Sequence, residues 1–244
     1  LVGTVISLLS AWKTLERYFE EMRFRQWQIQ YSPDDYMNPD LPIYTVYNRW
    51  IGGSYGQVEL DIFFLLIPIL AILAYAWSYH EEKKSGYSRN VVCRTGRTAY
   101  FFSKYISAFL AGFTAILIPM VCNLMLISAF IPAVAPDVYY DIYNGIMTDN
   151  MGFQMFYEMP FLFLILRLTL DCTVGGLSAA CVVALTFFIR NKFALMLAPF
   201  LALLVIQYAS ALWYYYVSEI SISPLEFIKA GSRSSSAWIA GGYV

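Results

Sequence analysis

The stretch DIFFLLIPILAILAYAWSY (Asp61–Tyr79) is apolar along almost its whole length and carries a charge only at its first residue. A helix of about 20 apolar residues spans the hydrocarbon core of a lipid bilayer. The whole chain is 59% hydrophobic and 14% charged, whereas a soluble domain averages about 45–50% and about 25%. These features predict an all-α, multi-pass membrane protein.

Three further segments are long and apolar enough to span a membrane: Ala99–Ile131 with an expected kink at Pro119, Pro160–Ile189, and Phe193–Val217. Leu1–Trp12 is too short to span alone, and we interpret it as the outer end of an earlier helix that begins before this sequence. We expect residues 1–244 to form a single transmembrane domain in contact with membrane lipids. The net charge of −1 provides no basic field for nucleic acid.

The distribution of Lys and Arg predicts which side of the membrane each loop occupies. The loop at 132–159 has neither residue, whereas those at 80–98 and 190–192 hold Lys83, Lys84, Arg89, Arg94, Arg97, Arg190 and Lys192. Because cytoplasmic loops carry the excess of Lys and Arg, we expect 80–98 and 190–192 inside the cell. The segments 13–60, 132–159 and 218–244 are then extracytoplasmic.

The sequence lacks the motifs of the common catalytic sites. There is no GxxxxGK[ST] loop for ATP, and the single histidine, His80, forms neither an HExxH zinc site nor a Ser–His pair. None of the four cysteines lies in an extracytoplasmic loop or at zinc-ligand spacing, so we interpret them as inert buried thiols. We expect no enzyme activity, metal or cofactor in this chain.

The first extracytoplasmic segment has two parts. Lys13–Gln28 has helical spacing, so it is expected either to extend the first helix beyond the membrane or to lie along the interface. Residues 31–56 are rich in Pro, Asp, Asn, Gly and Tyr, which indicates turns and irregular loop. We interpret their aromatic residues as a belt in the headgroup zone, in preference to a sugar- or peptide-binding surface.

The apolar segment Pro160–Ile189 contains two charged residues and a run of small residues. Arg167 and Asp171 share a helix face four residues apart, which favours a structural ion pair over a proton relay or a substrate contact. Small residues four apart predict close helix packing: Gly175 with Ala179, and Gly176 with Ala180. Ala108 and Gly112 on the preceding span are expected to do the same.

Residues 80–98 have the features of a structured element and not only of a solvated, orientation-setting loop. Gly86 is expected to break the preceding helix, Tyr87–Arg94 to form a short helix closed by Thr95–Gly96, and Thr98 to cap the next span. A loop that only sets orientation does not need a helix of its own. We therefore predict a rigid element between two spans, suited to transmit force from a soluble motor.

The residues of this element resemble those of a known family. The run AYAWSYHEEKKSGYSRNVVCRTGRTAYFFSKYISAF (74–109) is similar to the cytoplasmic segment of permease subunits of type-2 ABC exporters, in particular to an uncharacterised bacterial group with the pattern SY…KSGY…N…R…Y…KY. Co-linear matches extend over most of the chain: Trp50–Gly52, FIPAVAPD (130–137), the LDxxxGG pattern at Leu170–Gly176, and FFIRNKF (187–193). His80 and Cys93 depart from the pattern.

This resemblance implies a six-helix permease of the bacterial cytoplasmic membrane, of which the chain holds four complete spans and the end of the first. It implies a second permease subunit, identical or different, and a separate ABC ATPase that binds ATP and Mg²⁺. Ser223–Val244 would contain short re-entrant helices before a sixth span. The segment 80–98 would couple to the ATPase through Glu81, Glu82, Lys83, Lys84, Tyr87, Arg89, Arg94 and Arg97.

The function expected from the resemblance is export of a lipid-like molecule, a peptide or a drug, driven by the separate ATPase. Two alternatives stay open. One is an ABC-type membrane subunit that signals or transmits force without transport. The other is a membrane scaffold or channel with no motor.

Overall fold

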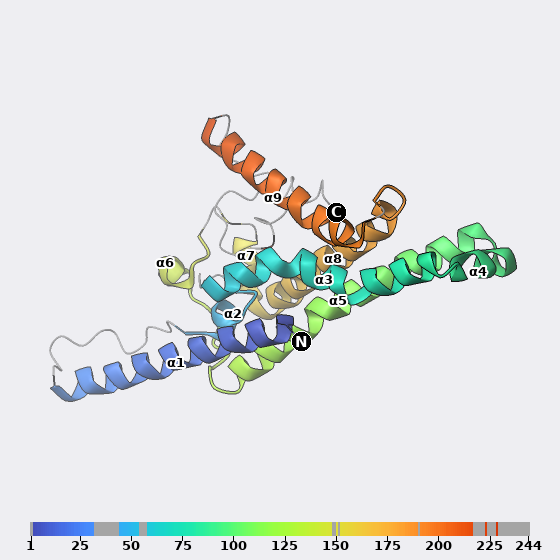
Figure 1. Cartoon of the computed structure of the whole chain (residues 1–244). Helices are drawn as coiled ribbons and strands as arrows, with labels where there is room; N and C mark the ends of the chain where they lie inside the picture. Colours follow the sequence, from blue (N-terminus) through green and yellow to red (C-terminus); the bar gives the residue numbers. More distant parts are fainter. Residues whose placement is uncertain are drawn as a thin grey trace.

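The computed structural model describes residues 2–31, 44–53, 58–147, 150, 152–189, 191–216, 223 and 228. All regular structure in these residues is helical, which confirms the predicted all-α class (Figure 1). Four helices are long and apolar enough to cross a membrane, as expected of a multi-pass membrane protein. They are α3 (Val58–Lys84), α5 (Arg97–Ser128), α8 (Pro160–Leu185) and α9 (Lys192–Tyr216).

Each predicted span coincides with one of these helices, and the differences lie at the ends. α3 continues through the charged residues to Lys84, so only Ser85 and Gly86 separate it from α4 (Tyr87–Thr95). α5 begins at Arg97 directly after Gly96, which places Thr98 inside the first turn and makes its predicted role as a cap wrong. α5 also continues as one helix through Pro119.

The first helix, α1 (Val2–Tyr31), joins Leu1–Trp12 and Lys13–Gln28, which the sequence analysis treated separately. Its buried residues all lie in the first half: Gly3, Ser7, Ser10, Ala11, Thr14 and Leu15. The second half projects away from the bundle, as expected for an extension of the first helix (Figure 1). An ion pair between Lys13 and Glu59 joins α1 to the start of α3.

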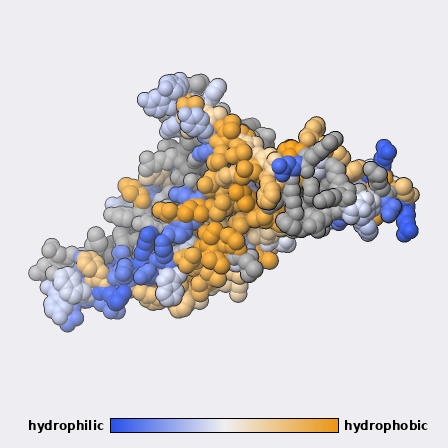
Figure 2. Space-filling model, viewed as in Figure 1, coloured by the Kyte–Doolittle hydropathy of each residue, from blue (hydrophilic) through white to orange (hydrophobic). Residues whose placement is uncertain are grey.

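The helix α5 lies at the centre of the bundle. It packs most extensively against α8 and also against α1 and α3, whereas α9 contacts α3 and α8. The interior between these helices is apolar and includes the fully buried Phe63, Phe64, Ile67, Ile116 and Met120. Figure 2 shows a hydrophobic band across the middle of the molecule, with hydrophilic surface on the projecting part of α1 and around α4.

Residues 44–53 lie inside the end of the bundle that is opposite α4. This segment contains the short helix α2 (Val46–Arg49), which contacts α5 and α8. Trp50 is only 2% exposed, so the predicted place of this aromatic residue in the headgroup zone is wrong. A Cβ atom at Gly52 would overlap the Trp50 ring and one at Gly53 would overlap the Asn48 carbonyl, so the turn requires both glycines. Residues 32–43 and 54–57 lie outside the described part.

The segment between α5 and α8 folds over the same end of the bundle, which we call the α7 end. It contains η2 (Val138–Tyr140), α6 (Asp141–Asn144) and α7 (Phe153–Glu158). Ile146, Phe156 and Phe163 form a small core there. The predicted re-entrant segment at 218–244 lies outside the described residues except for Ser223 and Ile228, which are both buried.

The cysteines differ from their predicted burial. Cys172 is buried, but Cys93, Cys122 and Cys181 are exposed, so the prediction of buried thiols is wrong for three of the four. Cys122 and Cys181 lie on faces of spanning helices that are not covered by protein. A free thiol behaves as a small hydrophobic group, so a lipid-facing position suits it without burial.

Candidate functional site

The charged element between α3 and α5 forms one far tip of the molecule (Figure 1). With a rise of about 1.5 Å per residue, α3 is about 40 Å long and α5 about 48 Å long. The hydrocarbon core of a bilayer is only about 30 Å thick. The charged ends of both helices therefore extend past the membrane, and α4 joins them there.

Two glycines give α4 a fixed start and end. Gly86 has a φ of +75° and Gly96 a φ of +83°, and neither Cβ position has a neighbour within 4 Å. These glycines are therefore required by the backbone conformation and not by packing. The Gly96 amide closes α4 by donating to the Val92 carbonyl at 3.0 Å.

We call the charged ends of α3 and α5, which carry α4, the stem. An ion pair holds these two helices together next to α4. Lys104 Nζ on α5 lies 2.5 Å from Glu82 Oε2 on α3, and both side chains are largely shielded from solvent. The same ammonium lies 5.6 Å from the centroid of the Tyr100 ring. α4 packs against both α3 and α5. Force applied to α4 therefore acts on the two helices as a unit.

The structure places the predicted coupling residues in two groups. Tyr87, Arg94 and Arg97 are exposed at the tip, where a partner could contact them. Glu82 instead pairs within the stem. Glu81, Lys83 and Lys84 lie in α3 and Arg89 in α4, but their side chains are outside the described part. Sequence reasoning missed the pairing of Lys104, although a lone lysine in the apolar run FFSKYISAF signals a need for a partner.

Arg167 and Asp171 lie on the buried face of α8, where they are 4% and 0% exposed. Their charges attract each other. However, Arg167 Nε and Nη2 and both carboxylate oxygens of Asp171 are buried without a hydrogen-bond partner. The predicted direct ion pair is thus not made in this conformation, although the spacing of four residues permits it.

The predicted small residues lie where α5 and α8 cross. A Cβ atom at Gly112 would be 2.6 Å from Ala179 Cβ and 2.8 Å from the Gly175 carbonyl oxygen. A Cβ atom at Gly176 would be 2.7 Å from the Phe109 ring. The two backbones therefore approach closely along this line. Gly175, Gly176 and Ala179 are buried, Ala180 is half-buried, and Ala108 on α5 is fully buried.

Asn123 is a buried polar residue that the sequence analysis did not single out. Its Nδ2 donates to the Ser7 carbonyl of α1 at 2.8 Å, and its Oδ1 accepts from the Ile51 amide at 2.9 Å. The Ser7 hydroxyl donates to the Pro119 carbonyl at 2.5 Å. Asn123 thus joins α1, α5 and the turn after α2. A lone amide in an apolar span was the signal available in the sequence.

No family model, no curated protein and no solved structure matches this chain. Within the described residues, no group of three or more His, Cys, Asp and Glu side chains could hold a metal ion. What the described tip offers is a set of exposed cationic and aromatic side chains, Tyr87, Arg94 and Arg97, at the ends of two long helices.

Proposed function

We propose that this chain is the membrane-spanning permease subunit of an ABC exporter, driven by ATP hydrolysis on a separate subunit at α4. One observation carries the proposal. A short helix with its own start and end sits on two spanning helices that extend past the membrane. Tyr87 and Arg94 of this helix and Arg97, the first residue of α5, are exposed to solvent.

The geometry suits conversion of a push on α4 into movement of the membrane helices. α4 is joined to the ends of α3 and α5, and Glu82 and Lys104 tie those helices together. Both α3 and α5 pack against α8. Gly112, Gly175 and Gly176 let α5 and α8 approach closely at their crossing. A movement of the charged ends of α3 and α5 would thus reach α8 through this close contact.

In the proposed cycle, ATP binding by the partner moves α4 and shifts the spanning helices between inward-open and outward-open arrangements. The substrate is a lipid-like molecule, a peptide or a drug. Two permease subunits, identical or different, form the pathway. The resemblance of residues 74–109 to type-2 ABC permeases supports this reading.

The proposal is tested by purification of the tagged chain from membranes of its own host, with identification of co-purifying proteins. We expect an ATPase that carries a GxxxxGK[ST] motif. The double variant Arg94→Glu and Arg97→Glu is expected to lose it while membrane abundance is unchanged. Both side chains are exposed, so charge reversal should not disturb folding.

A matched control reverses two exposed arginines at the other end of the molecule, Arg17→Glu and Arg23→Glu in α1. This control is expected to retain the ATPase. Retention of the ATPase by the Arg94/Arg97 variant, or the lack of any co-purifying ATPase with the wild-type chain, would contradict the proposal.

A further inference from the structure

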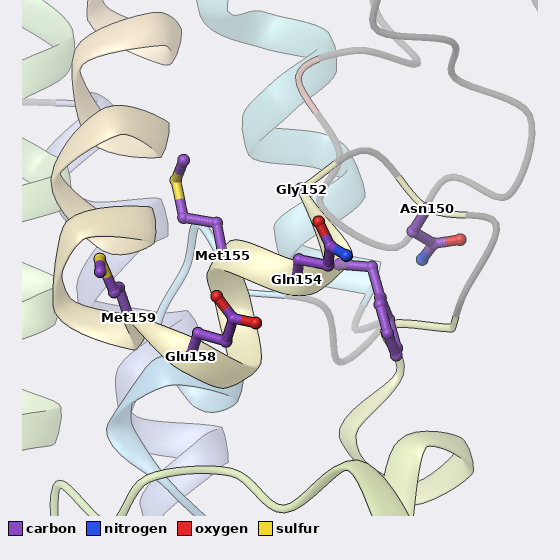
Figure 3. Close-up of a pocket in the computed structure, with 7 residues that line it drawn as sticks. Asn150, Gly152, Gln154, Met155, Glu158 and Met159 are labelled. Atoms are coloured by element: carbon purple, nitrogen blue, oxygen red, sulfur yellow. The ribbon is translucent and has the colours of Figure 1, made fainter.

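A cavity of about 690 Å³ lies at the α7 end of the molecule, on the opposite side from α4. Its lining residues come from α7 and its two flanks: Asn150, Gly152, Phe153, Gln154, Met155, Glu158 and Met159. Figure 3 shows Gln154 and Glu158 projecting from α7, with Asn150 on the chain that precedes the helix. The volume is in the range of ligand sites, about 300–1,000 Å³.

Asn150 is the residue in this cavity that needs an explanation. Its side chain is 5% exposed, and neither its amide oxygen nor its amide nitrogen has a hydrogen-bond partner. The other buried asparagines of the described chain, Asn48, Asn123 and Asn144, all form side-chain hydrogen bonds. Buried amides are normally satisfied, so Asn150 has an unused donor and an unused acceptor at the cavity. These two atoms complement the C=O and N–H of a peptide group.

Glu158 is the charged side chain among the described residues that line the cavity. The sequence from Tyr105 to Leu166 contains Asp137, Asp141, Asp149 and Glu158 but no Lys, Arg or His. The Phe153 ring adds an aromatic surface of the kind that attracts a cation. A carboxylate, amide oxygens and an aromatic ring together form a suitable environment for an alkylammonium group.

We propose that this cavity binds a basic segment of a peptide, with a lysine ammonium at Glu158 and a peptide group at Asn150. A zwitterionic lipid headgroup suits the site less well, because its phosphate would meet Glu158 and none of the described lining residues is a cation that could receive it. The site belongs to this chain alone and does not depend on the proposed ATPase.

Binding is tested with the full chain in phosphatidylcholine nanodiscs, without any ATPase. The probe is dye-labelled, N-acetylated trilysine amide, followed by fluorescence anisotropy. The same peptide with acetylated lysine side chains serves as the neutral control. We expect saturable binding of the basic peptide, at least tenfold weaker binding of the neutral one, and a loss of affinity as salt is raised.

Two variants test the residues. Glu158→Gln is expected to weaken binding at least tenfold, whereas Asp141→Asn, the same charge change in α6 and outside the cavity lining, should weaken it less than threefold. Asn150→Leu is expected to lose binding without loss of thermal stability, because the amide it removes has no partner. Its thermal midpoint distinguishes lost binding from misfolding.

Three results would overturn the proposal. Equal weakening by Glu158→Gln and Asp141→Asn would indicate general attraction without a site. Unchanged affinity in a folded Asn150→Leu protein would show that Asn150 does not contact the peptide. Loss of peptide binding when phosphatidylethanolamine replaces phosphatidylcholine would show that an aminolipid headgroup fills the cavity. None of these results bears on α4, so the proposed function is tested separately.

Discussion

Asn123 illustrates how one side chain can position three segments of this protein. The carbonyl of Ser7 and the amide of Ile51 both bond to its side-chain amide inside the bundle. These backbone groups are buried, so water cannot replace Asn123 as their hydrogen-bond partner. The cost of an unmade hydrogen bond is then larger than the gain from a made one.

We therefore predict that Asn123→Leu destabilises the protein by about 1–3 kcal/mol, since it leaves the buried Ile51 amide unpaired and removes a second bond from the Ser7 carbonyl of α1. The measurement is the thermal midpoint of the purified protein in detergent. Asn90→Leu, on the exposed surface of α4, is the matched control and should leave the midpoint unchanged. Equal midpoints for wild type and Asn123→Leu would rule out this role.

Arg167 and Asp171 pose a different problem at the residue scale. Both are ionisable and both are buried in α8, where Arg167 Nε and Nη2 and both carboxylate oxygens of Asp171 have no hydrogen-bond partner in this conformation. Charges inside a membrane protein are costly and are usually paired or functional. Their mutual attraction makes each the natural counter-charge of the other, so we expect the pair to serve helix packing.

Removal of one member should therefore harm the protein more than removal of both. Asp171→Asn leaves the Arg167 cation without a counter-charge, which costs about 3–5 kcal/mol for buried pairs. The expected result is a reduced yield and a lower thermal midpoint, partly restored by the double variant Arg167→Met and Asp171→Asn. Normal abundance of Asp171→Asn with altered substrate selectivity would instead assign the pair to transport.

Among the elements, the crossing of α5 and α8 depends most on the size of its side chains. Gly112 faces Ala179 and Gly175, and Gly175 faces Ile116, so there is no room for added carbon atoms. The pattern of small residues predicted a packing face correctly in kind. It did not reveal which helix would be the partner, because the spacing of small residues on one helix does not specify its neighbour.

Gly112→Leu is expected to force α5 and α8 apart and to destabilise the protein by about 1–3 kcal/mol or more, the usual cost of overpacking. Ser107→Leu adds a leucine to the exposed side of the same helix and should have little effect. Size-exclusion chromatography after heating steps compares the two. Equal resistance of both variants to heating would show that the crossing tolerates side-chain bulk.

The long helices could be predicted from the sequence, whereas the short buried segment could not. Continuous apolar runs near 20 residues have one stable form in a bilayer, so α3, α5, α8 and α9 follow from composition. Residues 44–53 are rich in turn formers and aromatic side chains, which is equally typical of a surface loop. Their burial depends on contacts with α5 and α8, which local sequence does not encode.

At the scale of the whole molecule, the structure has two polar ends separated by an apolar band (Figure 2). One end carries the basic helix α4. At the other end the segment from Tyr105 to Leu166 holds acidic residues and no basic ones, while α1 contributes Arg17 and Arg23. The positive-inside rule predicts that α4 lies in the cytoplasm. Charge patterning thus predicted the separation of the two ends, because it acts on loops and not on packing. The Glu82–Lys104 pair and the cavity at Asn150 could not be predicted from the sequence, because they depend on contacts in the folded structure.

The central claim, that α4 is a cytoplasmic lever that contacts a motor protein, is tested most directly through Cys93, which is exposed on α4. Cys122, Cys172 and Cys181 are replaced by Ala, and a membrane-impermeant maleimide is applied to intact cells and to inverted membrane vesicles. We predict labelling of Cys93 in inverted vesicles only, slowed when the ATPase subunit is bound. As a control, Cys93 is also replaced by Ala and a cysteine is introduced in α6 by Ile142→Cys. This cysteine should be labelled in intact cells. Labelling of Cys93 in intact cells, or labelling in vesicles that is insensitive to the bound ATPase, would contradict the account.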